Sequence, residues 1–417
     1  MSGQKEKDLP VNEPGFFYGY VIVVVAFMIM VVFWGAFYSF GVFFKPIVSQ
    51  FGWTRAMTSG AFSLTSIISG SLGIAMGGLT DKYGPRIVMT LCGLFLGLGY
   101  VLMSQLSAIW QLYLFYGTIV GIGMGGSFVP LMSTVARWFI GKRSTMSGIV
   151  VAGIGIGAFI GPPIASRLIA CYGWRASYVI LCCTLLAVVL LCAQFLRRDP
   201  AQMGKIPYGD DAGAEKVPKQ DTKEYSLREA VYTTQFWRVF VIFISLGFCV
   251  YAVMVHIAPH ATELGISAIR AASILAMIGG SSIVGKVVLG RAADRIGSKK
   301  TLLIGFILMS AALFLVSPAN GEMLLFLFAA VFGFAYGGCV TSESPLVAEL
   351  FGLKSHGVIL GVIAFSFTIG GAGGPLLVGY IFDVAGRYQL GFLVCAAISL
   401  NGLVLTAILK QRRVRGQ

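Results

Sequence analysis

The sequence predicts an all-α membrane protein in which twelve transmembrane helices form two six-helix bundles related by a pseudo-two-fold axis. Two observations lead to this fold class. First, 57% of the 417 residues are hydrophobic and only 12% are charged, which is too few charges to cover a soluble particle of this size. Second, landmarks in the first half of the chain return in the second half at a constant distance, as expected for a duplicated unit.

Twelve predominantly apolar runs are each long enough to cross ~30 Å of hydrocarbon. In the first half they cover residues 20–44, 58–79, 87–106, 110–135, 146–168 and 176–196. In the second half they cover residues 236–261, 269–290, 301–316, 323–347, 358–382 and 390–409. We expect each run to be helical, because only a helix or a closed barrel pairs all backbone polar groups inside a membrane.

The polar stretches divide the chain into five parts. We expect an amino-terminal tail (1–16), a first bundle (17–196), a linker (197–235), a second bundle (236–409) and a carboxyl-terminal tail (410–417). The linker is the one long polar stretch, and it mixes acidic residues with lysines and prolines. The amino-terminal segment lacks a short apolar core with a cleavage site, so the first helix is expected to direct the chain to the membrane.

The basic residues predict how the chain is oriented. The formal net charge is +14, but 24 of the 31 lysines and arginines fall on the side of the tails and the linker, six fall on the other side, and Lys286 lies inside a span. By the positive-inside rule, both termini are cytoplasmic. This distribution argues against a nucleic-acid partner and favours a multi-pass protein whose partner is the lipid bilayer.

The eight cysteines mostly lie within apolar runs and show no CxxC spacing. We interpret them as small packing residues. The sequence therefore predicts no disulfide framework, no metal site and no cofactor.

The two halves share two landmarks at one offset. The decapeptide Gly77–Arg86 (GGLTDKYGPR) aligns with Gly290–Lys299 (GRAADRIGSK), an offset of 213 residues (290 − 77). The pair Gly161-Pro162 aligns with Gly374-Pro375 at the same offset. Two unrelated landmarks at one offset indicate duplication, and each decapeptide marks the point where a helix leaves the membrane.

These residues resemble the major facilitator superfamily over essentially the whole chain. The two decapeptides resemble its loop signature, and the glycine-proline pairs resemble its fifth-helix motif. Residues 138–153 look like the fifth-helix signature of monocarboxylate transporters, and residues 18–21 look like their first-helix entry. Residues 256–267 look like the seventh-helix end of bacterial members and of oxalate/formate exchangers. The resemblance implies a bacterial inner-membrane protein that moves an organic anion by alternating access.

The sequence also departs from this family at three aligned positions. Animal monocarboxylate transporters have an aspartate and an arginine one turn apart in helix eight, and a lysine in helix one. The aligned positions here hold Ser282, Lys286 and Tyr38. A fixed positive charge is kept as lysine while the nearby acid is absent, so the proton coupling of those relatives cannot be carried over unchanged.

Lys286 is the principal candidate for binding a substrate anion. It is the one basic residue well inside an expected span, where a charge costs about 2.5–3.5 kcal/mol on the mildest insertion scale. In a two-bundle transporter the substrate lies near the midplane between the repeats, and a carboxylate there would supply the missing counter-charge. The alternative is a lysine that extends to the membrane interface with its stem in lipid.

Other residues are candidates for completing this site. Tyr38, Ser282, Tyr116, Tyr336 and Phe365 could form a small amphipathic pocket, although tyrosine and phenylalanine in helices are more often packing residues. His256 and His260 lie four residues apart near the outer end of the seventh span, where they form either a plain interfacial pair or a gate or proton-access group, and a metal site is not expected.

Four acidic residues also stand out at the ends of spans. We expect Glu343 and Glu349 to pair with Arg291, Arg295 or another loop base, with Glu343 as an alternative proton carrier. Asp81 and Asp294, in the duplicated decapeptides, are expected to hold the inner face shut by pairing with loop bases and helix ends.

Taken together, the sequence predicts a secondary transporter of small monocarboxylates such as L-lactate or pyruvate, acting as a monomer by proton symport. Lys286 itself is one candidate proton carrier, because an arriving carboxylate supplies the counter-charge that an ammonium needs in an apolar cavity. The alternatives are a carboxylate exchanger of the oxalate/formate type and an exporter of drug-like organic anions. An enzyme is not expected, because the spans contain no catalytic pair or metal cluster.

Overall fold

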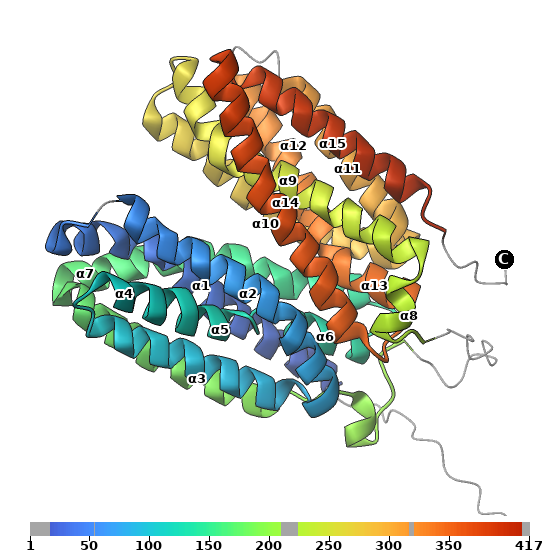
Figure 1. Ribbon diagram of the computed structural model, residues 1–417. Coiled ribbons are helices and arrows are strands. Elements are labelled where there is room, and N and C mark those ends of the chain that lie inside the picture. Colours follow the sequence, from blue (N-terminus) through green and yellow to red (C-terminus); the bar gives the residue numbers. More distant parts are fainter. Residues whose placement is uncertain (1–16, 54, 210–223, 317–320, 411–417) are drawn as a thin grey trace, which may run out of the picture.

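The structure is a computed structural model that describes residues 17–53, 55–209, 224–316 and 321–410. The described chain is almost entirely helical and forms two helical halves that lie side by side (Figure 1). The expected tail 1–16, linker residues 210–223 and the end of the carboxyl-terminal tail, 411–417, lie outside the described residues.

The first half contains six crossings. They are formed by α1 (Gly19–Phe51), α2 (Arg55–Tyr83), α3 (Pro85–Ser104), a composite fourth span and α7 (Arg143–Phe195). The fourth span consists of α4 (Ile109–Leu112), the π-helical η1 (Tyr113–Val120), α5 (Gly121–Met124) and α6 (Val129–Trp138).

The long α7 is two membrane crossings joined by a sharp turn. Gly173 has a φ of 75°, a left-handed value that suits glycine, and it breaks the 53-residue helix between two apolar runs. At about 1.5 Å of rise per residue, an unbroken helix of this length would far exceed the thickness of a membrane. The described part of the chain has 11 helical stretches long and apolar enough to span, and the turn in α7 makes them twelve crossings.

The second half repeats this arrangement. Its crossings are α9 (Thr234–Glu263), α10 (Ala268–Ile296), α11 (Ser298–Val316), α12 (Glu322–Thr341) continued by α13 (Glu343–Phe351), α14 (His356–Ala385) and α15 (Gln389–Ala407). The prediction of twelve helices in two bundles is confirmed.

Part of the linker is docked on the first half. It forms the short 3₁₀ helix η2 (Pro200–Met203), and the short helix α8 (Leu227–Val231) precedes the second half. Tyr208 pairs with Phe139 through a backbone bridge, in which Tyr208 N donates to Trp138 O at 3.0 Å. The ring of Tyr208 also packs beside Phe17 and Tyr20.

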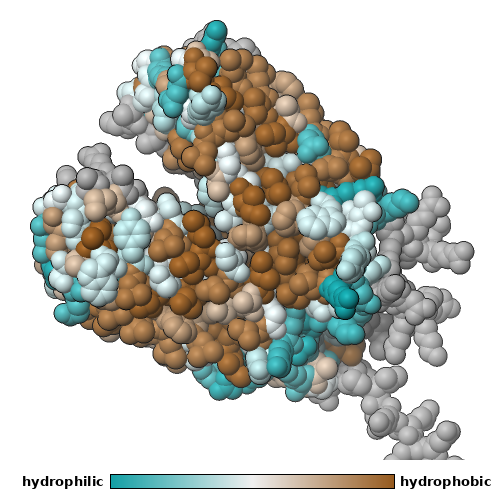
Figure 2. All heavy atoms as spheres, viewed as in Figure 1, coloured by the Kyte–Doolittle hydropathy of each residue, from teal (hydrophilic) through white to brown (hydrophobic). Residues whose placement is uncertain are grey.

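The outer faces of the helices are apolar. On α3, Leu91, Leu94 and Leu98 are exposed, whereas Leu96 and Tyr100 on the opposite face are buried. Hydrophobic residues cover most of the visible surface between the ends of the molecule (Figure 2). This inversion of the usual soluble pattern is expected for helices whose outer faces contact lipid.

The halves touch along two seams and separate toward one end. One seam is formed by α2 with α14 and the other by α7 with α10. A Cβ on Gly77 would collide with the carbonyl oxygen of Gly357, and one on Gly148 would collide with that of Lys286, so glycine allows the backbones to meet. We call this the closed end; at the opposite, open end the halves diverge and the surface between them is hollowed (Figures 1 and 2).

Candidate substrate site and the contacts at the closed end

Lys286 lies on α10, at the seam between the halves. Its side chain is buried, with 2% of its surface exposed, and Nζ lies 5.8 Å from the ring centroid of Tyr336 on α12. Among the described residues, no carboxylate lies within ion-pair distance of Nζ, and no other group accepts a hydrogen bond from it. The buried ammonium group of Lys286 therefore has no counter-charge among the described residues.

Ser282 lies one turn from Lys286 on the same helix. Its hydroxyl is buried and donates to the carbonyl oxygen of Gly279 at 2.7 Å. The oxygen keeps a free lone pair, so it can still accept a hydrogen bond from a bound ligand.

Two further tyrosines, one from each half, lie near Tyr336. Tyr38 on α1 lies close enough to Tyr251 on α9 and to Tyr336 for their hydroxyl groups to interact electrostatically. Tyr38 keeps 40% of its surface exposed although it lies in the middle of its helix, as expected beside the hollow between the halves. Lys286 and Ser282 on α10, Tyr336 beside Lys286, and Tyr38 and Tyr251 near Tyr336 are thus the polar groups of the candidate site.

Tyr251 was missed by sequence reasoning. It lies within an apolar run, and one tyrosine among aromatic residues has no local feature that separates a cavity wall from packing. Only the placement of α9 opposite α1 identifies it. In the structure its ring lies over α14, 5.8 Å from the ring of Phe367.

Two other candidates lie in packing positions. Tyr116 is fully buried in the first half, where its ring stacks on Phe40 at 4.1 Å and its hydroxyl donates to Phe37 O at 3.3 Å. Phe365 lies in the α2–α14 seam, where a Cβ on Gly70 would lie 3.5 Å from its ring. No described contact joins either residue to Lys286.

The two histidines lie toward the open end of the molecule, in the last part of α9. His256 Nε2 lies 2.9 Å from the carbonyl oxygen of Pro375, and its ring lies 5.2 Å from that of Tyr388. His260 is buried, its Nε2 has no partner in the described structure, and its ring packs edge-on to Phe392. Within the described ranges no group of three His, Cys, Asp or Glu side chains is placed to hold a metal.

The two glutamates near the closed end differ in their contacts. Glu349 accepts a hydrogen bond from Ser298 Oγ at 2.6 Å. Glu343 is buried, and its Oε1 has no partner among the described residues. The expected pairing with Arg291 or Arg295 is wrong, because both arginines are exposed and neither forms an ion pair with a described glutamate. The predicted alternative, another loop base, fits Glu349, which lies near enough to Arg143 for their charges to interact.

Asp81 caps a helix of the opposite half. Its two carboxylate oxygens accept hydrogen bonds from the backbone N–H groups of Gly357 at 3.2 Å and Val358 at 3.1 Å, in the first turn of α14. A carboxylate at this position pairs with unsatisfied donors and with the positive end of the helix dipole. We call this contact the Asp81 cap.

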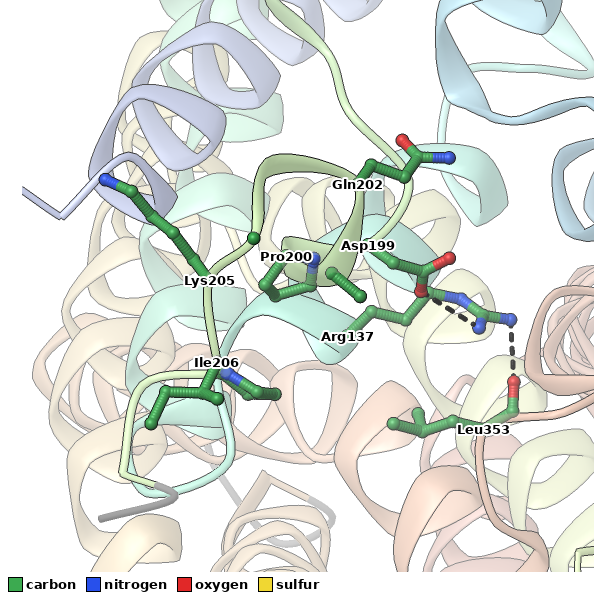
Figure 3. Close-up of a pocket in the computed structure, with 10 residues that line it drawn as sticks. Arg137, Asp199, Pro200, Gln202, Lys205, Ile206 and Leu353 are labelled. Atoms are coloured by element: carbon green, nitrogen blue, oxygen red, sulfur yellow. Dashed lines mark hydrogen bonds and ion pairs between the residues drawn. The ribbon is translucent and has the colours of Figure 1, made fainter. Parts of the chain in front are cut away.

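Arg137 reinforces the Asp81 cap. Its Nη2 donates to Asp81 at 2.9 Å and to the carbonyl oxygen of Leu353 at 2.6 Å, while Nη1 donates to Asp199 of the linker at 3.3 Å. The side chain therefore joins the first half, the linker and the second half. Arg137, Asp199 and Leu353 also border a cavity of about 760 Å³ at the closed end, lined mainly by the linker from Asp199 to Pro207 (Figure 3).

Asp294 forms the equivalent contact in the other direction. Its carboxylate accepts hydrogen bonds from the backbone N–H groups of Ser144 at 2.7 Å and Thr145 at 2.8 Å, in the first turn of α7. We call this contact the Asp294 cap. Both duplicated aspartates therefore bind a helix end of the opposite half, as predicted, although their donors are backbone N–H groups rather than mainly loop bases.

The comparisons with known proteins agree with this architecture. The model of the Major Facilitator Superfamily matches residues 25–295 and 259–417. Monocarboxylate transporter 13 of Bos taurus is 28% identical over 388 residues, covering 92% of this chain and 88% of the relative. The oxalate:formate antiporter of Oxalobacter formigenes is 25% identical over 364 residues, covering 85% and 84%.

A solved structure with the same fold is the proton:xylose symporter XylE bound to 6-bromo-6-deoxy-D-glucose. It aligns with a TM-score of 0.74 at 13% identity and covers 95% of this chain and 97% of its own. With the family model matched over both halves, the chain belongs to the Major Facilitator Superfamily, as a multi-pass membrane transporter related to monocarboxylate transporters and to an oxalate:formate antiporter.

Proposed function

We propose that this protein transports small monocarboxylates such as L-lactate or pyruvate by proton symport, through alternating access and without a cofactor. The observation that supports this proposal is the buried ammonium of Lys286, which has no counter-charge among the described residues and lies between the two halves. A carboxylate that binds there forms a charge-assisted hydrogen bond in a low-dielectric site.

The surroundings of Lys286 favour a small anion with a single charge. Tyr38, Tyr251 and Tyr336 offer hydroxyl groups on aromatic rings, which suits a short substrate with one polar and one apolar end. No second cation lies beside Lys286 in the described structure, so the site balances one carboxylate.

Proton symport follows if anion and proton enter the low-dielectric site as a neutral pair. The groups available to hold the proton are Lys286 itself, the open-end histidines His256 and His260, and the buried acid Glu343. A net charge moved alone into the membrane would be far costlier than a neutral pair.

We assign the protein to the inner membrane of a bacterial cell, in which it acts as a monomer. The closed end faces the cytoplasm. The described chain begins and ends on that side: Phe17 packs near Phe139, and Leu409 O accepts from Lys299 Nζ. The positive-inside rule places this basic side within the cell. In this orientation the Asp81 and Asp294 caps hold the cytoplasmic gate shut while the substrate site faces outward.

The related antiporter supports a second candidate, exchange of small carboxylates of the oxalate/formate type. Export of larger organic anions ranks third. An enzymatic role has no support from the relatives, which are membrane transporters.

Flux into proteoliposomes tests these candidates. The purified chain is reconstituted, and uptake of labelled L-lactate, oxalate and formate is followed with and without an inward proton gradient. Symport predicts net lactate uptake that rises with the gradient and needs no internal anion. Uptake that depends on internal oxalate or formate would instead support exchange, and lactate uptake that ignores the gradient contradicts symport.

A further inference from the structure

Glu343 is a buried acid without a partner. It is 4% exposed, its Oε1 accepts no hydrogen bond, and it takes part in no ion pair within the described parts of the chain. Most buried carboxyl groups are paired, because an unpaired carboxylate away from water is strongly disfavoured. A group of this kind needs a physical explanation.

Glu343 lies on the closed-end side of the candidate substrate site. It lies seven residues after Tyr336, and seven residues make about two turns, so both side chains lie on one face of the α12–α13 helix. Only Ser342 separates α12 from α13, and its φ of −78° and ψ of −8° keep the chain close to helical. Glu343 therefore lies between the Tyr336–Lys286 site and the closed end.

The same segment forms part of the joint between the halves. Ser344 Oγ lies 3.4 Å from Met132 O on α6, and Thr341 Oγ1 lies 3.5 Å from Lys286 O on α10. Two more buried hydroxyls without a partner, Ser133 on α6 and Ser147 on α7, lie on the helices that α13 contacts. Movement of one half against the other would change the surroundings of Glu343.

The cations of the neighbouring elements are engaged elsewhere. On α6, Arg137 binds Asp81, Asp199 and Leu353. On α7, Arg143 Nε donates to the carbonyl oxygens of Ala136 and Phe139, at 3.0 and 3.1 Å. On α11, Lys299 donates to Leu409 O.

The other titratable groups are likewise occupied or lie apart. On α14, His356 Nε2 lies 3.0 Å from Ser344 O, and on α13 itself Glu349 binds Ser298. Asp294 on α10 accepts from the first turn of α7. On α10, Arg291 and Arg295 are exposed, and Lys286 is therefore the buried cation of that helix that has no partner in the described structure.

Glu343 and Lys286 are two buried ionisable groups of opposite charge, and neither has an ion-pair partner among the described residues. With the closed end shut and no partner, Glu343 is accommodated best as the neutral acid. Lys286 needs a counter-charge, which either a bound carboxylate or an ionised Glu343 can supply. The Cβ of Glu343 tilts toward the amino-terminal end of its helix, which is the side of Tyr336 and Lys286.

We propose that Glu343 is the proton-binding group of the transport cycle and that it alternates with the substrate as the counter-charge of Lys286. In the empty carrier Glu343 is ionised, and its carboxylate moves into contact with the Lys286 ammonium, with which it forms no ion pair in the arrangement described above. An arriving substrate carboxylate takes that place, and the freed Glu343 carboxylate binds one proton, so the loaded carrier holds one anion and one proton. This inference rests on the proposed function, because it takes the ligand of Lys286 to be a carboxylate.

Proton counting on the full chain in detergent tests the proposal. Calorimetry of L-lactate binding in buffers of different ionisation enthalpy measures the protons taken up. We expect about one proton per lactate for the parent and loss of this uptake in Glu343→Gln, which preserves the shape of a neutral acid but cannot ionise. Glu343→Met, also unable to ionise, replaces it if the glutamine variant fails to fold.

Two control variants distinguish Glu343 from Lys286 as the proton-binding group. Glu263→Gln, at an exposed position near the open end, should keep the proton uptake of the parent. Lys286→Arg, which does not deprotonate in proteins, should also keep it, whereas it would lose it if Lys286 were the carrier. Unchanged proton uptake in a folded Glu343 variant overturns the proposal.

A second measurement does not require lactate to be the substrate. Infrared difference spectra are recorded on the parent with L-lactate, formate or oxalate added in turn. The carbonyl stretch of a buried protonated carboxylic acid should appear with the anion that binds, be missing in Glu343→Gln and be present in Glu263→Gln. A band that appears with formate or oxalate but not with lactate contradicts the choice of substrate while supporting the role of Glu343. Anion binding that produces no such band in the parent contradicts the role of Glu343 even if lactate is transported.

Discussion

The two halves of the molecule close one end with the same backbone contacts. The Asp81 cap binds residues 357 and 358, and the Asp294 cap binds residues 144 and 145. The aspartates are 213 residues apart (294 − 81), and so are the helix ends that they bind (357 − 144). A duplicated unit therefore supplies both caps, each half binding the other.

The glycine contacts of the seams repeat in the same way. A Cβ on Gly148 would meet the backbone of Lys286, and one on Gly361 would lie 3.0 Å from the carbonyl oxygen of Gly73. Both pairs are displaced by the same 213 residues (361 − 148 and 286 − 73). The backbone near the substrate site is thus shared by the two halves.

The charges, in contrast, are not shared. Lys286 occupies the position that Gly73 holds in the first half, so the charge proposed to bind the substrate belongs to the second half alone. Arg137 reinforces the Asp81 cap, whereas the matching position in the second half is Leu350. The comparison indicates that duplication provides the scaffold, while a few unmatched side chains provide the proposed substrate anchor and an additional contact to one of the two caps.

The largest expected effect tests the unmatched lysine. Lys286→Ala should abolish saturable lactate binding, because losing one member of a buried charge pair costs ~2–5 kcal/mol. Lys286→Arg should keep part of the affinity, since the charge persists with a different shape. Calorimetry measures both, with the exposed Lys300→Ala as the control. An affinity of Lys286→Ala close to that of the parent rules out this residue as the anchor.

The second effect compares the two caps. Asp81→Asn and Asp294→Asn each weaken hydrogen bonds of a charged group, worth about 1.5–3 kcal/mol. Both should impair lactate flux more than equilibrium binding, because they shift a conformational balance and leave the site intact. The effect should be larger for Asp81, whose loss also removes a partner of the buried Arg137.

Flux and binding measured on the same preparations check this order. Distances between spin labels across the closed end report the opening directly. Loss of binding in a normally folded Asp81→Asn or Asp294→Asn variant would contradict the role of the caps. Equal opening in both would show that Arg137 adds nothing to the first cap.

The sequence was sufficient to predict the scaffold. Apolar runs and repeated decapeptides are local signals. The twelve helices, and the equivalence of Asp81 and Asp294 in the two repeats, could therefore be predicted from the residues alone. Lys286 also stood out, because a charge inside an apolar run is rare. Its location at a seam between the halves, with Tyr336 beside it, could be determined only from the packing of the helices.

The walls of the candidate site could not be read in the same way. Tyr116 and Tyr336 look alike in sequence, yet one is packed within the first half and the other lies beside Lys286. Tyr251 carried no signal at all. The pairing predicted for Glu343 was wrong because the direction in which a side chain points depends on contacts between distant helices.

The third effect tests the glycine contacts of the caps. A Cβ on Gly77 would overlap the carbonyl oxygen of Gly357, whereas one on the matching Gly290 would lie 2.8 Å from Ser144 O. Gly77→Ala should therefore hold the closed end further apart than Gly290→Ala, at a cost of roughly 1–3 kcal/mol for overpacking. Spin-label distances across the closed end measure the difference, and a larger opening in Gly290→Ala would contradict this order.

The smallest expected effect concerns the linker, which has no counterpart in the duplication. Asp199 binds Arg137 at 3.3 Å but is about one-third exposed, and ion pairs of this kind contribute about 0–1 kcal/mol. Asp199→Asn should therefore change the spin-label distances across the closed end far less than Asp81→Asn, and the change should shrink further in high salt. The exposed Asp383→Asn, on α14 toward the open end, is the control. An opening as large as that of Asp81→Asn would mean that the linker is part of the first cap, and that the asymmetry between the halves extends beyond the two bundles.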